Sequence, residues 1–284
     1  MKKHIGVKGT ILRIIDIIFK LFLIVCVAFP FYWMIITAFK TNQEALIFPP
    51  TMWPENWNFS NFAEALKSMP FFNMYKNTII VAVTVTAAQF LFVVPAAYGF
   101  AKYRFKGSGF FFGIVLLSFM LPQQLTFLPI YLMFSKAKLL EVTLINTLLP
   151  QILPFIANGF GIFLLRQYFL QVPEEIIEAA RLDNASETRI VLKIMVPMAK
   201  SAISAVAMLQ FISVWNSYFW PLAMTNSDAV RPISIGVAML NTTEGGTNWP
   251  VLMAACLMMI LPIVVAYIFF NKKIQSAFVY KGIK

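Results

Sequence analysis

Charged residues are scarce in this sequence, and their scarcity excludes an ordinary soluble protein. Only 12% of the 284 residues are charged and 60% are hydrophobic, whereas soluble domains average about 25% charged residues. With a single histidine, His4, and two cysteines, Cys26 and Cys256, the chain lacks the residues for a histidine-rich metal site or a disulfide framework. Phenylalanine is abundant instead, with 29 residues. Long apolar runs without charge indicate that the solvent is a lipid bilayer.

The 23 basic and 12 acidic residues all fall outside six long windows. Because a helix needs about 20 apolar residues to cross a bilayer, each window is long enough for one span. The predicted fold class is therefore an all-α polytopic membrane protein with six transmembrane helices, in one transmembrane domain over residues 1–284. The approximate spans are residues 21–39, 77–101, 107–135, 142–165, 201–227 and 245–271.

The third window is not expected to hold one straight helix. Pro122 and Pro129 flank Gln123-Gln124-Leu125-Thr126, and proline breaks helix continuity. The helix is expected to end near Pro122. The break either lines a pore or is a helix end at the membrane interface, and the sequence leaves both open.

Orientation follows from the basic residues in the connections. With the N-terminus inside, the inner segments carry 17 Lys and Arg residues and the outer segments carry 6, so both termini are predicted to be cytoplasmic. The basic residues are spread over four segments, which does not favour nucleic-acid binding. The first outer segment, 40–76, holds an amphipathic stretch at Phe59–Leu66. It is expected to be a folded cap or docking surface, with a plain connection as the alternative.

The inner loop over residues 166–200 predicts a helix–turn–helix lying under the membrane. Pro173 is expected at the first helical position. Asn184 is expected to end the first helix in the left-handed conformation, and with Glu187 it resembles a capping pair for a second helix that runs toward Pro197.

One face of the first predicted helix suits a partner. Glu174 and Glu178 stand four residues apart, so their carboxylates share a face. Small Ala179 and Ala180 permit close approach. A groove on a cytoplasmic partner would fit this face, and the alternative from amphipathicity alone is a solvated loop without a partner.

The spacing within the loop resembles a motif of ATP-binding-cassette importer permeases: Glu-Ala-Ala, three residues, Gly, nine residues, then Ile-x-Leu-Pro. Here Glu178-Ala179-Ala180 is followed by Asn184 at the Gly position and by Ile194-Met195-Val196-Pro197. Other runs look like the carbohydrate branch, specifically the smaller six-span subunit of maltose-type importers. These runs are Phe160–Phe169, Trp215–Leu222, Asn248–Ala255 and the tail Phe278–Lys284.

The resemblance implies a transport subunit of a bacterial or archaeal cytoplasmic membrane, not an enzyme. With a second permease subunit, as a heterodimer, it would form the path for a sugar or oligosaccharide that an external solute-binding protein delivers. Two ATPase subunits would bind the inner loop and carry ATP and Mg, since this chain has no G-x-x-x-x-G-K-[ST] motif and is expected to bind no cofactor. The expected coupling residues are Glu174, Glu178, Ala179, Ala180, Asp183 and Asn184.

The windows contain no ionisable residue, which argues against a proton- or sodium-coupled route and suits a neutral, hydroxyl-rich substrate. For Trp220, beside Pro221, a structural role is favoured. The candidate pathway residues carry amide or aromatic groups, with interfacial anchoring or helix–helix hydrogen bonding as the alternative for each. They are Gln151, Asn158, Gln210, Asn216 and Tyr218.

Three other functions remain as alternatives. The first is an importer subunit for another polar solute, such as a polyol or a glycerol phosphoester. The second is a stand-alone secondary transporter, which should show buried charges and internal repeats. The third is a membrane-embedded enzyme, which would need a nucleophile, a base or metal ligands at the membrane surface.

Overall fold

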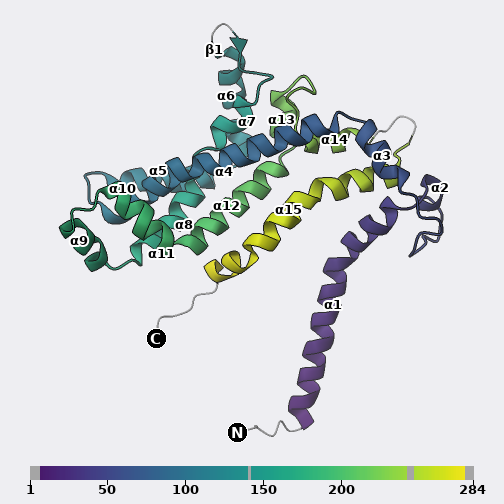
Figure 1. Cartoon of the computed structure of the whole chain (residues 1–284), viewed down its shortest axis with the longest axis horizontal. Helices are drawn as coiled ribbons and strands as arrows, with labels where there is room; N and C mark the ends of the chain where they lie inside the picture. The colour runs from purple at the N-terminus through teal and green to yellow at the C-terminus, as the bar shows by residue number, and fades with distance from the viewer. Residues whose placement is uncertain (1–6, 140–141, 242–245, 279–284) are drawn as a thin grey trace. The chain divides into compact units, whose positions relative to one another are not determined.

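The structure, a computed structural model, describes residues 7–139, 142–241 and 246–278, and it is almost entirely helical (Figure 1). Its elements fall into two compact units: residues 1–69 with 237–260, and residues 70–236 with 261–284. Several residues used in the sequence predictions lie outside the described ones: the basic residues Lys2, Lys3, Lys281 and Lys284, Gly245 at the start of the sixth window, and the end of the similar tail.

The first unit contains α1 (Val7–Ala38), α2 (Asn42–Ala45), α3 (Ser60–Lys67) and the beginning of α15 (Trp249–Phe278). Its outer segment is folded, as expected, and the amphipathic stretch is α3. Asn61 donates from Nδ2 to the carbonyls of Ala38 at 2.9 Å and Lys40 at 2.8 Å. The buried Glu44 carboxylate accepts hydrogen bonds from Thr51 and from the Glu55 amide. These bonds satisfy polar groups that would otherwise be costly to bury, and they fix the segment to the end of α1.

The second unit contains most of the remaining helices and one short antiparallel hairpin, in which Lys138 pairs with Thr143 and Leu139 with Val142. The helix α14 (Ile233–Met239), like α15, belongs to both units. The other elements are α4 (Phe71–Lys102), α5 (Ser108–Met120), α6 (Gln123–Lys136), β1 (Lys138–Leu139), β2 (Val142–Thr143), α7 (Leu149–Ile152), the 3-10 turn η1 (Leu153–Phe155), α8 (Gly159–Leu170), α9 (Glu174–Leu182), α10 (Glu187–Ile190), the π-helical turn η2 (Val191–Met195), α11 (Val196–Met198), α12 (Lys200–Trp215) and α13 (Phe219–Met224).

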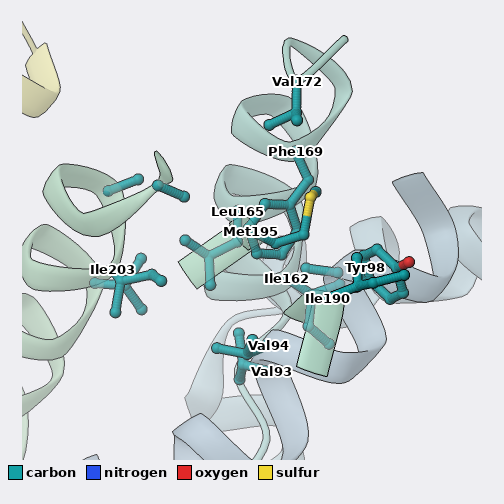
Figure 2. Close-up of a cluster of buried hydrophobic side chains, with 14 of the residues drawn as sticks. Val93, Val94, Tyr98, Ile162, Leu165, Phe169, Val172, Ile190, Met195 and Ile203 are labelled. Atoms are coloured by element: carbon teal, nitrogen blue, oxygen red, sulfur yellow. The ribbon is translucent and has the colours of Figure 1, made fainter. Parts of the chain in front are cut away.

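The core of the second unit lies where α4, α8 and α12 pack together with α10 and η2. Figure 2 shows side chains from these elements pointing toward one another. Gly161 lets α8 approach closely, because a Cβ there would stand 3.1 Å from methyl groups of both Val93 and Val206. The core reaches the inner loop as well, since Ile177 of α9 and Ile190 of α10 are fully buried in it.

The all-helical membrane fold is confirmed, apart from the short hairpin. Among the described residues, four helical stretches are long and apolar enough to cross a bilayer: Ile11–Ala38, Phe71–Lys102, Leu149–Leu170 and Trp249–Asn271. Two further candidates are bent pairs, and counting each pair as one span brings the number to six. The pairs are Ser108–Met120 with Gln123–Lys136, bent by 97°, and Glu187–Met198 with Lys200–Trp215, bent by 84°.

The windows therefore need correction where the backbone is interrupted. The expected break in the third window is present, because Leu121 takes the extended conformation that a following proline favours (ψ 126°). The fourth window begins in the hairpin and a short helix rather than in α8. The fifth window holds two helices, α12 and α13, separated at residues 216–218. A local break of this kind is compatible with membrane depth where protein or water lines it.

Candidate functional site

The first helix of the inner loop, α9, begins one residue later than the sequence predicted. Pro173 has ψ 139° and is the N-cap rather than the first helical residue. Glu174 and Glu175 occupy the first turn, where carboxylates favour the positive end of the helix dipole.

The end of α9 is a Schellman motif built on Asn184. This residue has φ +55°, the left-handed conformation that the sequence predicted. The Asn184 amide donates to the Arg181 carbonyl and the Ala185 amide donates to the Ala180 carbonyl, both at 3.0 Å. The predicted capping pair of Asn184 and Glu187 is wrong. Ser186 caps α10, because its hydroxyl accepts from the Arg189 amide, while Asn184 and Ala185 are used in the turn that ends α9.

One side of α9 is buried in the core and the other is exposed. Ile177 is fully buried and Ala180 is half-buried against the core, so Ala180 is a packing residue. The opposite side, here called the α9 outer face, consists of exposed Glu175, Glu178, Ala179 and Leu182. The Leu182 side chain is 84% exposed, and water is a poor environment for it.

The three acidic residues predicted for coupling have different surroundings. The Glu174 carboxylate points toward α4, where it pairs with Lys102. Glu178 and Asp183 are exposed, and neither makes a side-chain hydrogen bond or ion pair among the described residues. The sequence drew no attention to Leu182. Leu182 could have been found from the sequence, because it is an apolar residue on an otherwise polar helix face, directly before the polar turn.

The loop is fastened to α4 at Lys102. The Lys102 ammonium donates to the Val172 carbonyl at 2.6 Å and lies 3.1 Å from the Glu174 carboxylate. Its side chain is only 4% exposed, so this charge depends on both partners for compensation. From sequence, Lys102 was only one of the basic residues that set orientation.

A second attachment joins α4 to α10. Tyr98 donates from its hydroxyl to Glu187 Oε2 at 2.6 Å, and Arg181 of α9 donates to the other carboxylate oxygen at 2.9 Å. The Arg181 hydrogen bond, followed by that of Tyr98, lowers the pKa of Glu187 to about 2. Glu187 in turn raises the pKa of Arg181. Lys102 and Tyr98 with their partners Val172, Glu174 and Glu187 are called the α4 clamp below.

A cavity of about 430 Å³ lies in the same unit, beside the first half of α4. Figure 1 shows α7 and α13 along this half, whereas α9 and α10 lie at the other end. The walls of the cavity come from α4, α6, α7, η1, α12, α13 and the segments next to them. The lining residues are Thr78, Val81, Gln123, Gln124, Phe127, Gln151, Phe155, Ser213, Val214, Ser217, Tyr218, Phe219, Trp220, Pro221 and Pro232.

Two of the candidate pathway residues, Gln151 and Tyr218, line this cavity. Asn158 instead donates from Nδ2 to Gln210 Oε1 at 2.9 Å between α8 and α12, and the Asn158 Oδ1 caps α8 by accepting from the Gly161 amide. This is the helix–helix bond named as their alternative role. Asn216 caps the end of α12 and is not among the lining residues.

Trp220 has the structural role that was favoured for it. It is buried, and its indole donates to the Pro150 carbonyl at 2.8 Å. The cavity also contains Gln123 and Gln124, which entered the sequence argument only as neighbours of the Pro122 break. Within the described residues, no group of three or more His, Cys, Asp or Glu side chains is arranged to hold a metal ion.

The long apolar helices, the broken spans and the exposed helix in a polar loop define the class: a polytopic helical membrane protein of the transport-permease type. Residues 93–278 match the model of the family described as "binding-protein-dependent transport system inner membrane component", and the chain belongs to this family. It is a membrane transport subunit rather than an enzyme, and the resemblance drawn from the inner-loop motif is confirmed.

Curated relatives cover nearly the whole chain. It is 33% identical to the arabinooligosaccharide transport system permease of Halalkalibacterium halodurans, over 90% of this chain and 91% of the relative. It is 28% identical to the sn-glycerol-3-phosphate transport system permease of Brucella abortus, over 88% and 89%. A chain of a bacterial ABC transporter for the acidic polysaccharide alginate has the same fold, with a TM-score of 0.82 at 23% identity over 94% of this chain and 98% of that one.

Proposed function

We propose that this chain is one of two permease subunits of an ATP-driven importer for a sugar or oligosaccharide in a bacterial or archaeal cytoplasmic membrane. Its 284 residues form one membrane domain with six spans and with both termini inside. An external solute-binding protein delivers the cargo, and two separate ATPase subunits carry ATP and Mg. The proposal draws its cargo from the relatives, which include permeases for arabinooligosaccharides, and its orientation from the basic residues.

The geometry of α9 carries the coupling part of this proposal. The helix is fixed by its buried side, its capped end and the α4 clamp. Its outer face exposes the apolar Leu182 next to the carboxylates of Glu175 and Glu178 and the small Ala179. A rigid helix with an exposed apolar anchor is what a groove on a partner binds. The ATPase subunits bind this face at Glu178, Ala179 and Leu182, flanked by Glu174, Asp183 and the Asn184 turn.

The test is the replacement of two outer-face residues in the full complex, by Glu178→Lys and Leu182→Asp. Both side chains are exposed, so the chain is expected to insert in the membrane at its normal level. We expect the ATPase subunits to be lost on purification and ATP-driven uptake to fall with them. The larger loss is expected for Leu182→Asp, because a buried apolar anchor dominates a small interface.

A matched control is Leu46→Asp, which places the same change on a leucine that is 64% exposed in the first unit. It should leave the ATPase subunits bound. Normal ATPase binding and uptake by both outer-face variants would refute the coupling assignment. Ala179→Trp is the better steric probe than a change at Ala180, because Ala180 packs against the core.

A further inference from the structure

The cavity beside the first half of α4 carries no charge. None of its lining residues is acidic or basic. Arg231, next to the lining residue Pro232, is outside the lining and pairs with Asp228 at 3.0 Å. A carboxylate or phosphate taken out of water needs a cationic or multiply donating partner. The walls of this chain supply no cation for such a group.

The cavity does offer neutral hydrogen-bonding groups. Gln151 is 3% exposed, and its Nε2 donates to the Val230 carbonyl at 3.0 Å and weakly to Thr147. These bonds hold the amide in place, and its Oε1 accepts no hydrogen bond from the described residues. The side chains of Gln123, Gln124 and Tyr218 likewise make no hydrogen bond to the described residues.

Aromatic rings form the other wall. Phe127 lies 4.8 Å from Phe219 and 5.5 Å from Trp220, and Phe155 lies 5.5 Å from Trp220, measured between ring centroids. The Trp220 indole is fixed by its bond to Pro150. A sugar ring has an apolar C–H face and a rim of hydroxyls, so a site with one aromatic wall and one amide wall matches both.

We infer that this cavity is a binding subsite for one uncharged sugar unit of the transported saccharide. The inference rests on the proposed function and narrows the class of cargo. The similar proteins transport arabinooligosaccharides, sn-glycerol-3-phosphate or alginate, and the uncharged cavity favours a neutral saccharide over the two anionic solutes. The Gln151 Oε1 accepts a hydrogen bond from a sugar hydroxyl at a fixed position, Gln123 and Gln124 adapt to the ring, and the four aromatic residues contact its apolar face. The volume is within the range of about 300–1,000 Å³ that small-molecule sites occupy.

The test uses the full importer complex in lipid nanodiscs, with Cys26 and Cys256 replaced by serine and a single cysteine introduced by Gln124→Cys. The rate of labelling by a charged thiol reagent is measured during ATP turnover with arabinotriose, sn-glycerol-3-phosphate or an alginate trisaccharide. The matched control is Leu125→Cys, since Leu125 is the next residue on α6, is 67% exposed and does not line the cavity.

We expect arabinotriose to slow the labelling of Gln124→Cys about tenfold when it is present at about ten times its dissociation constant, and the two anionic probes to leave the rate unchanged. Labelling of Leu125→Cys should be unaffected by any probe. Equal protection by an anionic probe, protection of both positions, or a Gln124→Cys that is never labelled would overturn the inference.

Uptake by the complex with native Gln124 separates the two proposals. Import of the neutral trisaccharide without protection of Gln124→Cys removes the subsite and leaves the proposed function standing. ATP-driven import of sn-glycerol-3-phosphate alone refutes the neutral subsite and the sugar cargo, but not the importer. Import of the alginate trisaccharide alone refutes the neutral subsite and leaves an oligosaccharide cargo. The absence of ATP-driven import of every probe by a complex that contains the binding protein counts against the sugar cargo itself.

Discussion

The two ends of α4 differ in the chemistry that surrounds them. At its C-terminal end, Lys102 and Tyr98 bind carboxylates and a carbonyl of the inner loop, and four charged side chains take part, because Arg181 also binds Glu187. At its N-terminal half, Thr78 and Val81 face a cavity without any charged wall. The difference fits the two tasks proposed above: strong, permanent attachment at one end, and weak, reversible contact with a neutral solute at the other.

The helix itself connects these tasks. Val81 and Tyr98 are 17 positions apart, which is about 26 Å along an α-helix. We expect movement of α9 to be conveyed to α4 through the clamp, since the clamp joins the loop to α4 and α4 forms a wall of the cavity. A rigid element biased at both ends is the kind of structure through which coupling between distant sites operates. Changes at the two ends should therefore alter different properties of the importer.

The largest effect is expected from Lys102→Met, which keeps the length of the side chain and removes its charge. The variant loses the bonds to Val172 and Glu174, and bonds of this charged kind contribute about 1.5–3 kcal/mol each. The attachment of the loop weakens by about tenfold or more. The number of sugars imported per ATP hydrolysed, measured in proteoliposomes, should fall accordingly, while the affinity for the sugar is unchanged.

Lys106→Met is the control for this change. Lys106 is exposed, lies a few residues further along the same connection, and forms no ion pair among the described residues. It should import normally. A transport ratio that is equally low in both variants would show that the positive charge of the connection matters, rather than the clamp.

The second effect belongs to the cavity end. Asn77 is 3% exposed and donates from Nδ2 to the carbonyls of Ala229 at 2.8 Å and Arg231 at 3.1 Å. Asn77→Leu leaves the Arg231 carbonyl without this partner and the Ala229 carbonyl with only its bond from Asn73. The cost is about 1–3 kcal/mol, and the segment that carries the cavity residue Pro232 is held less firmly. The apparent KM for the sugar should rise severalfold while the number of sugars imported per ATP stays normal.

The half-buried Asn73 provides a graded comparison, because it bonds to the same segment at Asp228 and Ala229. Asn73→Leu should raise the KM less, since water can reach the freed carbonyls. A loss of coupling in Asn77→Leu without any change in KM would contradict the separation of the two ends.

A smaller effect is expected from Tyr98→Phe, which removes one hydroxyl from the clamp. Glu187 keeps its bond to Arg181, and one bond to a charged carboxylate is lost, so the loss is about 1.5 kcal/mol, or about tenfold in the attachment. Sugar imported per ATP should fall by less than in Lys102→Met. The double variant distinguishes the roles: additive losses indicate independent attachments, and a loss no greater than that of Lys102→Met alone indicates one cooperative clamp.

What the sequence could predict is mostly local. The left-handed Asn184 and the break before Pro122 follow from backbone preferences of single residues, and both are present. The cap on α10 was misassigned because Asn184 and Ser186 have similar capping chemistry, and only the closed turn decides between them. Pro173 was placed one residue too far inside the helix, because the fixed φ of proline suits the residue before the helix as well as the first helical residue.

Long-range partners could not be predicted. Lys102 and Glu174 are 72 positions apart, and Asn158 and Gln210 are 52 apart. A polar residue in an apolar window can face a solute or another helix, and its residue type alone does not separate the two. Gln151 lines the cavity and Gln210 bonds across a helix interface, although both are glutamines in charge-free windows. The coupling and pathway roles of these residues remain predictions.

The smallest expected effect is the response of the clamp to pH. Arg181 and Tyr98 lower the pKa of Glu187 to about 2 from an ordinary value of 4.5. A carboxylate with a lowered pKa stabilises the folded state fully above its ordinary value, and this contribution is lost only as the pH falls toward 2. The number of sugars imported per ATP by Tyr98→Phe, divided by the number for the wild type, should therefore be constant between about pH 5 and 8. Glu187 stays ionised throughout this range, which lies above the ordinary pKa of a glutamate. A ratio that rises or falls through this window would mean that a group titrating near neutrality, rather than Glu187, holds the inner loop to α4.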